Sequence, residues 1–86
     1  MPEVSRFFGI VIRMYYDEHN PPHFHAIYGS SQAEFGIAPI EVLRGGLPRR
    51  ANSMVIEWAA LHQNELLENW ELMRADSVPM KIEPLE

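Results

Sequence analysis

The sequence predicts a single α+β domain over residues 1–86, in which a small antiparallel sheet precedes two helices. Three observations support this fold class. Apolar and polar residues alternate over residues 5–43, as in strands that bury one face. Apolar residues then recur at helical spacing over residues 48–75, where neither glycine nor proline follows Pro48. A chain of 86 residues has room for one domain, and residues 76–86 form its tail.

The first predicted strand covers residues 5–16, SRFFGIVIRMYY, which are rich in β-branched and aromatic residues. The alternation places one set of side chains on a common face: Phe8, Ile10, Ile12, Met14 and Tyr16. Residues 17–22, DEHNPP, should end this strand, because the two prolines fix φ and lack the N–H that a strand needs. We therefore expect one strand followed by a stiff loop.

Two further strands are predicted to form a hairpin. Residues 23–28 and 32–37 both alternate, and Gly29 with two serines supplies the turn between them. Residues 40–43, which follow Pro39, are compatible with a fourth strand. The expected sheet therefore has three to four strands.

Two consecutive helices are predicted over residues 48–75, packed on one face of the sheet. Pro48 suits the first helical turn, where its missing N–H would have no partner. One straight helix of this length would extend about 42 Å, whereas a domain of this size is about 30 Å across. We therefore expect a break near His62–Asn64, with Asn64 capping the second helix. The tail over residues 76–86 is compatible with a short edge strand.

Composition restricts the classes of function. The chain has no cysteine, which excludes disulfides, cysteine-ligated zinc, iron–sulfur clusters and thiol catalysis. A net charge of −5 argues against a nucleic-acid-binding protein whose whole surface is basic. However, residues 1–50 hold five acidic and five basic residues, whereas residues 51–86 hold seven acidic and two basic residues. The first part could therefore meet a phosphate or an acidic partner without general repulsion.

No segment of the sequence predicts export or membrane insertion. The longest apolar run near the start is residues 7–12. A signal peptide needs an apolar region of about 7–15 residues behind a positive start, and a membrane helix needs about 20 residues. We therefore expect a cytoplasmic protein without a membrane partner.

Three of the four histidines lie within seven residues, at His19, His23 and His25. His23 and His25 are two apart on a predicted strand, so both project from one face. Asp17 and Glu18 precede His19 in the loop. Converging imidazoles could ligate a divalent metal, with all three histidines as candidate ligands. His23 and His25 are equally candidate catalytic residues for general acid–base chemistry. A purely structural role for the histidines is the third interpretation.

Three arginines surround a glycine pair and the predicted start of the first helix: Arg44, Arg49 and Arg50. Helix N-termini bind anions, because they present free N–H groups and a partial positive charge. The arginines and His19 are therefore the candidate binding residues for RNA or another anionic ligand. The alternative is an ordinary turn in which the arginines pair with nearby glutamates.

Nearly the whole chain resembles a known family. The stretch HNPPHFHA, at residues 19–26, and the pairs Glu57–Trp58 and Asn69–Trp70 are similar to the bacterial family called domain of unknown function 4160. The resemblance extends from about Val4 to Leu85. It implies small, cytoplasmic proteins whose genes often lie beside another small domain of unknown function, in pairs regarded as candidate toxin–antitoxin modules. The family has no established catalytic residues to transfer.

The resemblance, together with the small core and the uneven charge, implies a partner-binding component of a toxin–antitoxin-like module, with a small protein partner encoded nearby. One alternative is a small enzyme acting on RNA or another phosphodiester, in which His23 or His25 is the general acid or base and Arg49 or Arg50 holds phosphate. Another is a histidine-bound divalent metal that stabilises the domain. So small a core is also compatible with a homo-oligomer.

Overall fold

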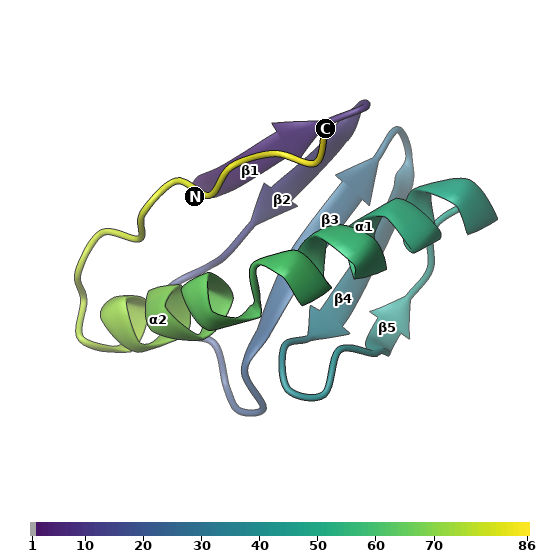
Figure 1. Cartoon of the computed structure of the whole chain (residues 1–86). Coiled ribbons are helices and arrows are strands. Elements are labelled where there is room, and N and C mark those ends of the chain that lie inside the picture. Colours follow the sequence, from purple (N-terminus) through teal and green to yellow (C-terminus); the bar gives the residue numbers. More distant parts are fainter. Residues whose placement is uncertain (1) are drawn as a thin grey trace.

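The computed structural model describes residues 2–86 and confirms the α+β class, with five strands followed by two helices. The elements are β1 (Glu3–Phe7), β2 (Ile10–Arg13), β3 (His23–Tyr28), β4 (Ser31–Gly36), β5 (Val42–Gly45), α1 (Arg49–Leu61) and α2 (Gln63–Arg74). All neighbouring strands pair antiparallel, and their spatial order is their order in the chain. Figure 1 shows both helices on one side of this sheet.

The predicted single strand over residues 5–16 is wrong, because the structure divides it into β1 and β2. Phe7 pairs with Ile10, so Phe8 and Gly9 form a two-residue turn. Both turn residues have positive φ, 49° and 81°, as a type I′ hairpin turn requires. The turn also changes which side chains point inward: Phe8 is 60% exposed, whereas Phe7 is buried with Ile10. The sheet therefore has five strands rather than three to four.

The hydrophobic core lies between the sheet and the helices. Its fully buried side chains from the sheet half of the chain are Val4, Ile10, Ile12, Met14, Phe24, Ala26, Phe35 and Ile37. The helices contribute Val55, Trp58, Ala59 and Leu66 as fully buried members. Trp58 lies at the centre, where its ring centroid is 5.4 Å from that of Phe7 and 5.7 Å from that of Phe24. The indole ring of Trp58 thus packs α1 against both β1 and β3.

The helical segment breaks at His62, within the range predicted from its length. The His62 N–H still bonds the carbonyls of Trp58 and Ala59, while its φ of −123° ends the helical path. The predicted cap is wrong, because Asn64 lies inside α2 and His62 holds the N-cap position. The His62 side chain makes no capping hydrogen bond there, and its Nδ1 lies 2.5 Å from the carboxylate of Glu65. Neither helix has the length and apolar character to cross a membrane, among the residues that the structure describes.

The C-terminal tail runs along the edge strand β1 (Figure 1) but forms no strand within residues 2–86. One backbone hydrogen bond joins it to the sheet, from the Ile82 N–H to the Val4 carbonyl at 2.8 Å. Two more hydrogen bonds join the tail to α2. The side-chain amide of Asn69 donates to the Met80 carbonyl and accepts from the Met80 N–H, each at 2.8 Å. Prolines on either side limit further pairing because they lack the N–H. The tail therefore covers the β1 edge, and β5 remains as the open edge of the sheet.

Candidate functional site

Strand β3 places His23 and His25 on the sheet face opposite the one that carries Phe24 into the core. The register with the two neighbouring strands puts Arg13 of β2 and Glu34 of β4 directly beside His25. Hence both histidines share their face with a carboxylate from β4. The two side chains, predicted to project from one face, lie side by side there, with their ring centroids 5.4 Å apart.

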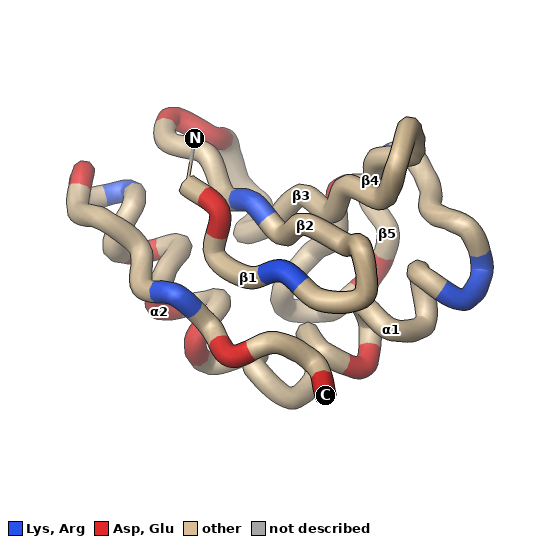
Figure 2. Tube along the Cα trace, turned by 90° about the horizontal axis from the view of Figure 1, so that it is seen from above, with Lys and Arg blue, Asp and Glu red and all other residues tan. Residues whose placement is uncertain are grey.

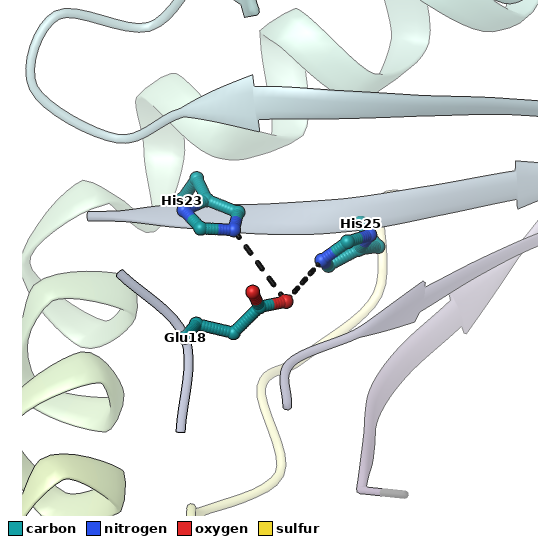
Figure 3. Close-up of side chains that lie close together, drawn as sticks. All are labelled: Glu18, His23 and His25. Atoms are coloured by element: carbon teal, nitrogen blue, oxygen red, sulfur yellow. Dashed lines mark hydrogen bonds and ion pairs between the residues drawn. The ribbon is translucent and has the colours of Figure 1, made fainter. Parts of the chain in front are cut away.

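Glu18 reaches these two histidines from the loop between β2 and β3 (Figure 3). Its Oε1 lies 2.7 Å from His25 Nε2 and 3.5 Å from His23 Nε2. One ligand atom from each of the three residues lies within 4.8 Å of the others. We call these residues the Glu18–His23–His25 group. His19, a predicted metal ligand, lies exposed on the same loop and is not a member of the group.

His23 is the most enclosed member, with 7% of its surface exposed. The Trp70 ring of α2 packs beside it at 5.2 Å between centroids. His23 Nδ1 lies 2.8 Å from the Pro21 carbonyl oxygen, and a carbonyl can only accept, so Nδ1 carries the hydrogen. In the neutral ring the lone pair is then on Nε2, which faces Glu18 (Figure 3).

The buried His23 Nε2 has no hydrogen-bond partner among the described residues. It does have two carboxylate oxygens near it, from Glu18 at 3.5 Å and from Glu34 at 3.9 Å. A lone pair and two carboxylates repel one another in a partly dehydrated site. This arrangement therefore favours a cation bound between them.

The group borders a cavity of about 360 Å³ on the surface. Glu18, Glu34 and His23 line this cavity, together with His19 from the loop and Arg44 from β5. Arg44 Nε lies 4.0 Å from Glu34 Oε2, and the arginine side chain is 82% exposed. Two of the predicted binding residues, His19 and Arg44, thus lie in the wall of the same cavity as Glu18 and His23.

The other two predicted binding residues, Arg49 and Arg50, lie away from the histidines. Arg50 lines a groove beside Tyr28, and Tyr28 ends the strand that His23 begins. A six-residue strand is about 20 Å long, so the two features are at opposite ends of β3. Figure 2 shows the basic residues at the start of α1 and the acidic loop after β2 far apart. The structure thus does not bring Arg49 or Arg50 together with His23 or His25.

Glu18 is the site residue that the sequence did not select as a ligand. Its position immediately before His19 was the only signal, and the loop path decides which of the two side chains turns inward. Glu34 was missed for a similar reason: its position opposite His25 depends on the β3–β4 register.

A family model described as domain of unknown function (DUF4160) matches residues 9–71. This match covers most of the chain, from the turn before β2 to the last turns of α2. The chain belongs to the DUF4160 family. The DUF4160 match confirms the resemblance seen in the sequence and includes the whole Glu18–His23–His25 group. No curated protein and no solved structure matches this DUF4160 chain.

Proposed function

We propose that the protein binds a divalent transition-metal ion through Glu18, His23 and His25. The observation that carries this proposal is the buried His23 Nε2, which has no hydrogen-bond partner among residues 2–86 and faces two carboxylates. Two imidazoles and one glutamate form a donor set of zinc sites that keep a fourth position open. The same donor set also binds non-haem Fe²⁺.

The surroundings of His23 support a metal-ligand role. A metal-binding histidine commonly donates its other ring N–H to a carbonyl or carboxylate, which fixes the tautomer and the ring orientation. The Pro21 carbonyl does this for His23, and the Trp70 indole packs against the ring. The lone pair of His23 Nε2 consequently points toward Glu18 even without a bound ion.

The spacing of the ligand atoms also suits one ion. Zinc–ligand distances of about 2.0–2.2 Å place tetrahedral ligand atoms about 3.3–3.6 Å apart. Glu18 Oε1 and His23 Nε2 are already 3.5 Å apart. Glu18 Oε1 and His25 Nε2, at 2.7 Å, would separate slightly when an ion replaces the hydrogen bond between them. Because protons compete with the ion for the imidazoles, affinity should decrease on acidification.

Calorimetric titration of the untagged protein with Zn²⁺ is expected to show one site. Each of Glu18→Gln, His23→Ala and His25→Ala should weaken the binding by at least about 100-fold, because loss of an outer-shell partner alone costs 10–100-fold. His19→Ala is the matched control, since this exposed histidine lies in the same loop region but outside the group. We expect its affinity to stay within about twofold of the parent.

Parallel titrations with Fe²⁺, Co²⁺ and Mn²⁺, and elemental analysis of the purified protein, would identify the preferred ion. Circular dichroism of each variant shows whether the fold is intact. A folded parent protein that takes up none of these ions would overturn the proposal. So would a loss of affinity in His19→Ala as large as that in His23→Ala.

A second candidate function is binding of a small protein partner, and we propose the open edge strand β5 as the contact. All four residues of β5 are exposed, and Val42 and Leu43 are 42% and 39% exposed although apolar. An extended segment of a partner can add to such an edge through main-chain hydrogen bonds. The resemblance to the family implies the occupant: the product of an adjacent gene in a toxin–antitoxin-like pair.

Co-expression with the adjacent gene product tests this second candidate. The parent protein is expected to co-purify with its partner, whereas the double variant Val42→Lys, Leu43→Lys should not, because charges on an edge strand oppose pairing. Val78→Lys is the control, since Val78 is an exposed apolar residue of the tail. Equal co-purification by the double variant, or none by the parent, would exclude β5 as the contact.

A further inference from the structure

We propose that the metal-loaded site binds a phosphate group, held between the open coordination position of the ion and Arg44. This inference rests on the proposed metal centre. It names phosphate as the class of ligand that the metal centre binds. The ligand enters through the cavity of about 360 Å³ that borders the Glu18–His23–His25 group.

The first step is the position of Arg44 relative to the group. Glu34 lies between them: its Oε2 is 4.0 Å from Arg44 Nε, and its Oε1 is 3.9 Å from His23 Nε2. One carboxylate therefore spans most of the distance between the arginine and a metal ligand. A phosphate group also presents anionic oxygens on opposite sides, so it can contact the ion and Arg44 at once.

The second step is the freedom of Arg44 to take a ligand. Its side chain is 82% exposed, and its ion pair with Glu34 is at the 4.0 Å limit of such pairs. A guanidinium presents a planar fork of N–H donors that matches phosphate bidentately. His19, exposed in the same cavity wall, supplies a further ring N–H.

The third step is the charge of the cavity, which changes sign when the ion binds. Without an ion, the ionised side chains of Glu18 and Glu34 outweigh that of Arg44, so the site repels anions. With a bound divalent cation, the summed charge of the ion, the two glutamates and Arg44 becomes one net positive charge. Phosphate binding should therefore require the metal, and removal of the Glu34 charge should strengthen it.

Cobalt provides the probe, because the visible spectrum of protein-bound Co²⁺ reports its coordination. Addition of inorganic phosphate to Co²⁺-loaded protein is expected to change this spectrum saturably. Arg44→Ala should weaken phosphate binding at least tenfold, and Glu34→Gln should tighten it several-fold. Arg49→Ala is the matched control, an exposed arginine at the start of α1, and should behave as the parent does.

The outcomes separate this inference from the metal proposal. Absence of a protein-bound Co²⁺ spectrum, in a protein that also takes up no Zn²⁺, Fe²⁺ or Mn²⁺, would overturn the metal centre itself. A normal Co²⁺ spectrum that phosphate does not change, or equal weakening by Arg44→Ala and Arg49→Ala, would overturn the phosphate inference alone. Acetate that saturates the site at the same concentration as phosphate would also overturn it. Phenyl phosphate and dimethyl phosphate, titrated in the same way, distinguish free phosphate from a monoester or a diester.

Discussion

Trp58→Ala is expected to lower the free energy of unfolding by about 3–5 kcal/mol, the usual cost of removing a buried tryptophan side chain. Trp58 is fully buried and packs against Phe7 of β1 and Phe24 of β3. Its Nε1 also donates to the Glu83 carbonyl at 2.8 Å, which holds the C-terminal tail. One side chain thus joins α1, the sheet and the tail. At about 0.05–0.15 kcal/mol per residue, a domain of this size loses a large share of its stability.

Urea unfolding followed by circular dichroism measures this loss. Leu61→Ala is the control in the same helix, because Leu61 is exposed, and its effect should stay within about 0.5 kcal/mol. Trp58→Phe should fall between the two, since it keeps an aromatic ring and loses the bond to the Glu83 carbonyl. A Trp58→Ala protein within about 1 kcal/mol of the parent would contradict the central position of this residue.

Saturation with Zn²⁺ is expected to produce the second large effect, an increase in thermal stability. An ion that binds only the folded protein adds about 4 kcal/mol at 1,000 times its Kd. For a domain of this size that corresponds to an increase in Tm of about 15–30 °C. The physical reason is that Glu18 lies in a loop and the histidines on β3, so folding is what brings the ligands together. A chelator should reverse the increase.

Glu18→Gln is the decisive variant for this effect, because the amide has nearly the shape of the carboxylate but lacks its charge. At the same Zn²⁺ concentration its Tm should rise by at most about a third of the parent's increase, because a site weakened about 100-fold is at only about 10 times its Kd and gains about 1.4 kcal/mol. His19→Ala should show the full increase. The gain of the parent protein should shrink as the pH is lowered, because protons compete with the ion for His23 and His25. An equal Zn²⁺-dependent increase in Glu18→Gln would contradict the ligand set.

The strand and helix patterns were largely predictable from the sequence, and the exceptions have local causes. The hairpin over residues 23–37 and the break at His62 followed from alternation, turn residues and helix length. The turn at Phe8–Gly9 was missed because an apolar aromatic residue continues the alternating pattern. Only the glycine signalled a positive φ there. Asn64 was wrongly predicted as the N-cap of the second helix, because this helix begins one residue earlier, at Gln63, with His62 as its N-cap.

By itself, the sequence determined the fold class, the absence of cysteine chemistry and the shared face of His23 and His25. These properties depend on composition or on the two-residue period of a strand, both of which are local. Only the tertiary structure decided that Glu18 rather than His19 meets the two imidazoles, and that Trp70 buries one of them. Such meetings depend on the path of a loop, the register between strands and the direction of α2 after the break. None of these is encoded by residue spacing along the chain.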